Sequence, residues 1–159
     1  TAASDEEAVL ENKIAEYDAF LTKQDPAFTV EELEEAMQKV MDQYAGGIGT
    51  HYQFNEKQLA MAEEKIKKLQ ILAKGLAAAD MHELMFIYEL KERLTVCLTV
   101  IAHLRARKET RWHSFAENLD YPEKSDAWLC YVNSKKNGDQ ITMIRRDLVK
   151  GGETYEHRD

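Results

Sequence analysis

Cysteine, proline and glycine are all scarce in this chain of 159 residues, which contains two, two and seven of them. Two cysteines are too few for a disulfide framework and too few for an iron–sulfur cluster, which needs about four thiolates. Cys97 and Cys130 each lie among apolar neighbours, so we expect buried, unreactive thiols in a reducing cytoplasm. The shortage of proline and glycine leaves few interruptions and predicts a largely helical chain.

Long hydrophobic runs and an excess of positive charge are also missing. The most apolar segment, residues 94–104, is too short to cross a bilayer, and no secretory signal is evident, so we expect no membrane insertion. The net charge is −8, and residues 1–50 alone carry 12 acidic and 3 basic side chains. Such an acidic surface repels phosphate, which argues against a nucleic-acid partner.

What the sequence does contain is helical periodicity in four stretches. The first is expected to begin after Ser4 and to end before Pro26, with Leu10, Ile14, Tyr17 and Leu21 on its apolar face. Three further helices are expected after N-terminal caps, with the patterns Thr29-x-x-Glu32, Asn55-x-x-Gln58 and Asp80-x-x-Glu83. Residues 46–49, Gly-Gly-Ile-Gly, should end the second helix.

The fourth helix, from residue 81 to about residue 108, is the most apolar and should be central to the core. Its main apolar face is predicted to consist of Leu84, Ile87, Leu90, Leu94, Cys97, Leu98, Ile101 and Leu104. Each large aliphatic side chain buried there should contribute about 1.5–3 kcal/mol.

Beyond residue 110 the pattern changes to an irregular, aromatic-rich arm. Residues 128–132 and 140–144 are short β-like runs, and Asn137-Gly138 between them is a typical hairpin signal. The charged residues 145–159 are expected to form a tail. The predicted fold is therefore all-α, a bundle of about four helices over residues 1–110, with an extended arm and hairpin over 111–159, together forming a single domain.

A search for catalytic chemistry is negative. The paired Glu-x-x-His motifs of di-iron bundles are absent, and the five histidines do not cluster. No nucleophile elbow, zincin, phosphate-loop or dinucleotide motif is present. The Gly-Gly-Ile-Gly stretch is not a phosphate loop, because it follows a helix rather than a strand. We therefore expect no catalytic, cofactor-binding or metal-binding residue in this chain.

One cluster at the end of the fourth helix invites two interpretations. Its basic residues, with Lys108 between them, are followed by an indole and an imidazole, so the candidates for contact with a partner or an anion are Arg105, Arg107, Arg111, Trp112 and His113. The alternative is structural: the cations complement the helix dipole, an acid pairs with Arg111, and Trp112 is packed at the helix exit.

The same junction carries a resemblance to a known family. Residues 108–113 (Lys-Glu-Thr-Arg-Trp-His), 120–124 (Asp-Tyr-Pro-Glu-Lys) and 128–135 (Trp-Leu-Cys-Tyr-Val-Asn-Ser-Lys) resemble the end of the α subunit of adenylylsulfate reductases. Residues 41–47, Met-Asp-Gln-Tyr-Ala-Gly-Gly, are similar as well. A looser similarity extends to the C-terminal domains of succinate dehydrogenase, fumarate reductase and L-aspartate oxidase flavoproteins, and the match covers roughly residues 30–140.

The resemblance implies a helical domain of an oxidoreductase of sulfur metabolism. FAD would be held by other parts of the parent flavoprotein and iron–sulfur clusters by a partner subunit. The expected role of this chain is structural, through contacts with the flavin-binding domain and with the iron–sulfur subunit, without catalysis of its own. The alternative is a stand-alone helical adaptor that binds other proteins without redox function.

Overall fold

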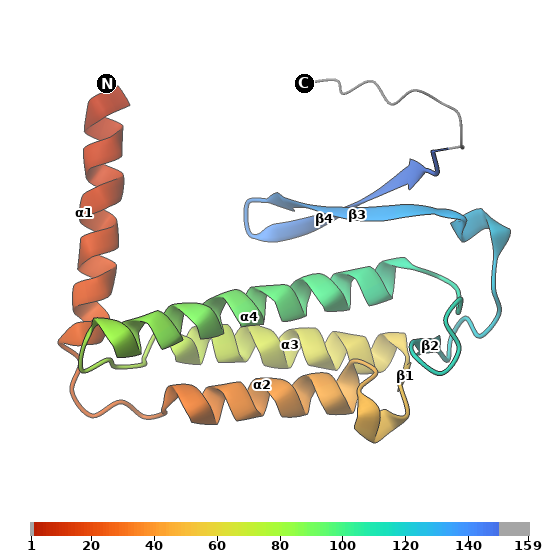
Figure 1. Cartoon of the computed structure of the whole chain (residues 1–159), viewed down its shortest axis with the longest axis horizontal. Coiled ribbons are helices and arrows are strands. Elements are labelled where there is room, and N and C mark those ends of the chain that lie inside the picture. The colour runs from red at the N-terminus through yellow and green to blue at the C-terminus, as the bar shows by residue number, and fades with distance from the viewer. Residues whose placement is uncertain (1, 150–159) are drawn as a thin grey trace. The chain divides into compact units, whose positions relative to one another are not determined.

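The computed structural model describes residues 2–149 and confirms a mostly helical chain with a C-terminal hairpin (Figure 1). The four helices are α1 (Ala2–Leu21), α2 (Val30–Tyr44), α3 (Glu56–Ala73) and α4 (Met81–Ala106). Two short strands pair with each other, β1 (Gln53–Phe54) and β2 (Glu117–Asn118), and the hairpin consists of β3 (Cys130–Asn137) and β4 (Gln140–Asp147). Single 3-10 turns are η1 (Ile48–Thr50) and η2 (Asp126–Trp128).

The chain folds as two compact units, and each is built from two stretches of sequence. The first unit comprises Thr1–Met41 and Glu63–Cys97, and the second comprises Asp42–Ala62 and Leu98–Asp159. The division of a single domain after residue 110, expected from the sequence, stays a prediction. None of the helices within residues 2–149 is long and apolar enough to cross a membrane.

The predicted caps of α2, α3 and α4 are confirmed. Thr29 Oγ1 accepts a hydrogen bond from the Glu32 N–H at 3.2 Å, and the Glu32 carboxylate accepts one from the Thr29 N–H at 2.9 Å. Asn55 Oδ1 accepts a hydrogen bond from the Gln58 N–H at 2.8 Å. Asp80 Oδ1 accepts one from the Glu83 N–H at 2.9 Å. These side chains satisfy amides that have no partner inside the helix, which fixes where each helix begins.

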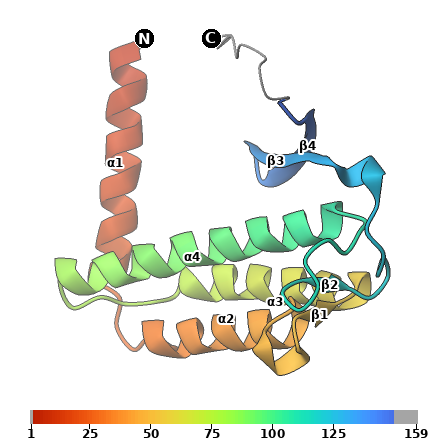
Figure 2. The same ribbon diagram turned by 45° about the vertical axis from the view of Figure 1, so that its right-hand side comes forward.

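The core of the first unit forms where segments of α2, α3 and α4 lie side by side (Figures 1 and 2). Its buried apolar side chains are Phe20, Leu33, Met37, Ile66, Leu69, Ala73, Leu76, Ala78, Leu84, Ile87, Leu90 and Leu94. Four of these, all on α4, belong to the face predicted from its periodicity. Packing of this face stabilises the helix more than its residue propensities do.

Only the second half of α1 packs as its predicted apolar face requires. Tyr17 meets the ring of Tyr88 edge-on at 5.3 Å, and Phe20 is buried. Leu10 and Ile14 belong to the same predicted face, yet they are 61% and 49% exposed. The predicted face is therefore confirmed only in part: Tyr17 and Leu21 are half-buried, and the buried side chain of this segment, Phe20, was not among the predicted residues.

In the second unit, the glycine-rich turn after α2 leads into the β1–β2 pairing. The predicted end of the helix at this turn is confirmed, and Gly46 has a φ of +74°. Asp42 Oδ1 accepts a hydrogen bond from the Gly49 N–H at 3.0 Å, and a Cβ added at Gly47 would lie 2.3 Å from the Asp42 Cα. The turn is thus folded tightly against the helix it ends. Strand β1 then pairs in parallel with β2, which ties the start of α3 to the arm.

The hairpin is longer than predicted, and its turn is shifted by one residue. Asn137 pairs with Gln140, so the two turn residues are Gly138 and Asp139 rather than Asn137 and Gly138. Of these two turn residues, only Gly138 has a positive φ, +60°, which matches a turn with glycine at its first central position. Residues 145–147, expected to belong to the tail, lie in β4, and residues 150–159 lie outside the described part.

Candidate contact site at the end of α4

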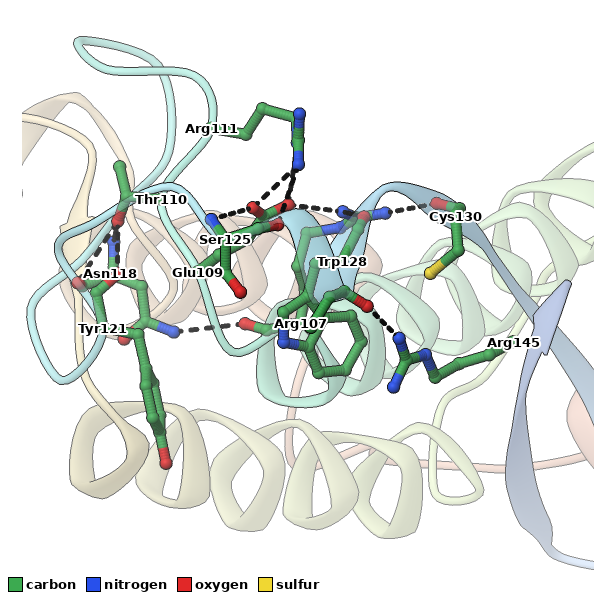
Figure 3. Close-up of polar contacts among 11 residues, drawn as sticks. Arg107, Glu109, Thr110, Arg111, Asn118, Tyr121, Ser125, Trp128, Cys130 and Arg145 are labelled. Carbon is green, nitrogen blue, oxygen red and sulfur yellow. Dashed lines mark hydrogen bonds and ion pairs between the residues drawn. The ribbon is translucent and has the colours of Figure 1, made fainter. Parts of the chain in front are cut away.

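A buried carboxylate lies at the centre of the segment that leaves α4. The Glu109 side chain is fully buried and accepts four hydrogen bonds (Figure 3). Its Oε1 accepts from Arg107 Nη1 at 2.7 Å and from Arg111 Nε at 2.8 Å. Its Oε2 accepts from Arg111 Nη2 at 3.0 Å and from the Ser125 N–H at 2.9 Å. We call these four residues the Glu109 cluster.

The pKa of Glu109 shows how strongly the cluster favours the ionised carboxylate. Burial acts to raise this pKa, because it removes water from the charge. The hydrogen bonds from Arg111, the Ser125 amide and Arg107 outweigh burial and lower the pKa from 4.5 to about 2. A buried charge is tolerated only when paired in this way.

The two arginines of the cluster also hold the chain that leads into the hairpin. Arg107 donates to the carbonyl oxygens of Trp128 at 2.9 Å and Cys130 at 3.1 Å. Arg111 donates to the carbonyl of Ser125 at 3.1 Å. The Glu109 cluster therefore connects the end of α4 with the start of β3, and its charged groups hold these two segments together.

A second set of buried polar contacts surrounds Thr110, which is 1% exposed. Its hydroxyl donates to the Tyr121 carbonyl at 2.9 Å and accepts from the Asn118 N–H at 3.0 Å. The Asn118 side-chain amide donates to the Arg107 carbonyl at 3.3 Å (Figure 3). These bonds fold residues 110–121 into a compact loop whose β2 strand meets β1.

The remaining cation among the predicted contact residues is also paired within the chain. Arg105 donates through Nε to Glu56 Oε1 at 2.9 Å, and the two side chains form an ion pair. The structural interpretation of the basic cluster thus holds for the pairing of Arg111 with an acid. It fails for Trp112, which is 69% exposed rather than packed.

Trp112 belongs to an exposed group at the outer side of the loop. Phe115 is 71% exposed, and the His113 side chain is 64% exposed, with its Nδ1 3.9 Å from Glu117 Oε1. We call Trp112, His113 and Phe115 the aromatic exit. The Phe115 N–H donates to the Trp112 carbonyl at 3.1 Å, so both exposed rings start from one tight turn. Exposed large apolar side chains in one segment are typical of a surface covered by another protein.

A hollow of about 220 Å³ lies next to these residues. Its lining combines apolar side chains with the arginines of the Glu109 cluster, and consists of Phe54, His103, Leu104, Arg107, Glu109, Arg111, Trp112, Ala116 and Val132. The structure therefore places three of the five predicted contact residues in one hollow, with His113 and Arg105 outside its lining.

No group of three or more metal-ligating side chains is gathered within the described residues. Both cysteines are free and half-buried, and burial raises the pKa of the Cys97 thiol. The expectation that the chain supplies no catalytic, cofactor-binding or metal-binding residue stays a prediction.

Comparison with known proteins decides the family. Residues 34–153 match the family described as fumarate reductase flavoprotein C-term. The chain belongs to this family. The resemblance drawn from residues 108–113, 120–124 and 128–135 is thereby confirmed.

Individual relatives point to one branch of the family. The α subunit of adenylylsulfate reductase from Megalodesulfovibrio gigas is 34% identical over 98 residues, which are 61% of this chain and 15% of that protein. The adenylylsulfate reductase structure from Archaeoglobus fulgidus superposes with a TM-score of 0.84 and 31% identity, over 94% of this chain and 26% of that one. E. coli quinol fumarate reductase shares the fold, with a TM-score of 0.73 and 19% identity, over 94% of this chain and 26% of that one. The chain thus spans 15% of the curated relative's length and about a quarter of those solved chains.

Proposed function

We propose that this domain belongs to an adenylylsulfate reductase and that it contributes structure and subunit contacts rather than catalysis. The observation that supports this best is the difference in identity between its relatives. Identity is 31–34% with adenylylsulfate reductases and 19% with the fumarate reductase, although the fold is common to both. Membership of a flavoprotein family favours this role over that of a stand-alone adaptor.

The cofactors of the proposed enzyme would lie outside this chain. We expect FAD in the remaining parts of the flavoprotein and iron–sulfur clusters in a partner subunit. The two cysteines here are separate and half-buried, which gives no set of thiolates for a cluster. A cytoplasmic location remains part of the proposal, because free thiols suit a reducing compartment.

The contact with the rest of the enzyme is proposed to involve the five predicted residues in two different roles. Arg105, Arg107 and Arg111 are paired with acids of this chain, so they hold the loop in shape. Trp112 and His113, in the aromatic exit, are the side chains that reach the iron–sulfur subunit. Aromatic side chains that become buried when two proteins associate carry a large share of the binding energy at protein interfaces.

The first experiment is purification of the chain alone and as bait from a native lysate, with flavin and iron measured in both. We expect a colourless chain and an eluate that contains flavin and iron–sulfur subunits. One flavin per chain in the isolated protein would overturn the non-catalytic role. An eluate of unrelated, colourless proteins would favour the adaptor instead.

The aromatic exit is tested by Trp112→Ala in the full-length enzyme. We expect weaker association of the flavoprotein with its iron–sulfur subunit and lower enzyme stability. Tyr131→Ala is the matched control, because Tyr131 is a similarly exposed aromatic, 51% accessible, on the hairpin. Equal effects of both substitutions would remove the case for the aromatic exit.

A further inference from the structure

Within residues 2–149, β3 and β4 pair only with each other, which leaves two strand edges without a neighbour. An isolated two-stranded hairpin is marginally stable in water and is usually completed by a third strand or by packing. The hairpin has one half-buried face, which includes Val132 and Met143, and one exposed face, which includes Tyr131 and Ile144. Its two edges differ in how well they are protected.

The outer edge of β3 is protected at both of its ends. At its start, the Cys130 carbonyl turns outward and accepts a hydrogen bond from Arg107. Near the turn, Lys135 and Lys136 place two charges on the strand, a common protection against unwanted strand pairing. The outer edge of β4 carries its charges only at the far end from the turn, at residues 145–147 (Arg-Arg-Asp), and residues 140–144 (Gln-Ile-Thr-Met-Ile) next to the turn contain no charge and no proline.

The outward Cys130 carbonyl also fixes which backbone groups of β4 face outward. Cys130 lies opposite Asp147, and hydrogen-bonded and non-hydrogen-bonded pairs alternate along an antiparallel ladder. Ile141 and Met143 therefore belong to pairs without ladder hydrogen bonds, so their N–H and C=O groups point away from β3. These groups are free to bind another strand.

We propose that this edge binds the same edge of a second copy of the chain, in antiparallel orientation about a two-fold axis at Thr142. In that register Ile141 and Met143 lie opposite each other and exchange backbone hydrogen bonds twice. Thr142 lies opposite its own copy, a favourable cross-strand pair. At both ends Asp139, in the turn directly before β4 of one copy, comes next to Arg145 of the other, which brings opposite charges together.

The sequence of the edge favours this register over its neighbour. A shift that puts Met143 on the two-fold axis would set Asp139 opposite Asp147, and like charges directly opposite destabilise a sheet. Arg145 is already held by stacking on the Trp128 ring at 4.3 Å, and its guanidinium has N–H donors left for a carboxylate. A contact limited to two strand edges buries little area, so we expect a weak, concentration-dependent dimer.

The test is a disulfide formed by Thr142→Cys under mild oxidant. Residues opposite each other in a non-hydrogen-bonded pair have Cα atoms about 4.5 Å apart, within the range of a disulfide. We expect rapid formation of a dimer that reductant reverses. Asn133→Cys is the matched control, because Asn133 is exposed on the same hairpin face but lies on β3. Equal cross-linking of both variants, or of the unsubstituted chain, would overturn the proposal.

Mass measured against concentration gives a second readout. The unsubstituted chain should rise from 18.3 kDa toward twice that mass as its concentration increases. Thr142→Lys should remain at the monomer mass, because it sets two cations opposite each other, whereas Asn133→Lys should behave as the unsubstituted chain. A monomer at every concentration would refute the pairing, and this result would be independent of the proposed flavoenzyme function.

Discussion

Replacement of Glu109 by glutamine should weaken the second unit more than any single change of charge in the arm that follows it. Glutamine keeps the shape of the side chain but removes the charge and replaces one acceptor oxygen with a donor. That donor would face either the Arg111 guanidinium and the Ser125 N–H, or the two arginines at Oε1. Two of the four hydrogen bonds are lost in either orientation.

The magnitude follows from the pKa of Glu109, because glutamine resembles the protonated acid. A pKa of about 2 in the folded chain, against an ordinary 4.5, means that the fold prefers the carboxylate. At about 1.4 kcal/mol per pH unit, the preference is about 3–4 kcal/mol. Removal of one partner from a buried ion pair costs about 3–5 kcal/mol in other proteins, which agrees with this value.

Tryptophan fluorescence is the suitable assay, since both tryptophans, Trp112 and Trp128, lie in the second unit. Urea unfolding at pH 7 should show a loss of about 3 kcal/mol for Glu109→Gln. Glu123→Gln, the same change at an exposed position of the arm, should cost less than about 0.5 kcal/mol. Far-UV circular dichroism would follow the helices separately, in case the two units unfold in separate steps.

The dependence on pH provides the stricter check. Because the folded pKa of Glu109 is lowered, its contribution is complete above the unfolded pKa of 4.5 and is lost as the pH falls toward 2. The difference between the unsubstituted chain and Glu109→Gln should therefore be constant from pH 7 to about 5 and shrink below that. A loss under about 1 kcal/mol at pH 7, or a difference that does not shrink in acid, would refute the reasoning.

Three smaller predictions concern other contacts. Thr110→Val should cost about 1–3 kcal/mol by the same fluorescence assay, because it leaves buried polar groups unpaired, while Thr110→Ser should retain most of the stability. Gly47→Ala should cost about 1–3 kcal/mol or more in urea unfolding, because the new Cβ would clash with the Asp42 backbone. Lys91→Met should cost less than about 1 kcal/mol by circular dichroism, and less still at high salt, because a third of the Lys91 side chain is exposed to solvent. We expect this small loss even though the Lys91 ammonium lies 4.5 Å from the centre of the Tyr88 ring.

Local patterns in the sequence were sufficient for the helices and their caps. The Thr29–Glu32 cap forms in both directions as its spacing predicts, since both partners lie within one turn. The hairpin was also predictable, but its turn was not. Asn137-Gly138 and Gly138-Asp139 are both acceptable turn pairs, and the choice depends on how the strands pair over their full length.

The Glu109 cluster was only half predictable. An acid partner for Arg111 was expected, but nothing local identified Glu109 as that acid or showed that Arg107 shares it. The only available signal was a glutamate with arginines two residues before and two after, in a segment without periodicity. Whether Trp112 is exposed or packed was left open for a related reason, because an irregular segment gives no rule for which side chains point outward.

The Glu109 cluster also limits how this segment can change through evolution. Loss of Glu109 alone would leave two cations without their shared anion, and loss of one arginine would leave a buried carboxylate short of donors. A chain with only one of these three residues replaced is therefore less stable than a chain with the full set, or than one in which apolar residues replace the whole set. Among related chains, positions 107, 109 and 111 should be inherited together or exchanged together.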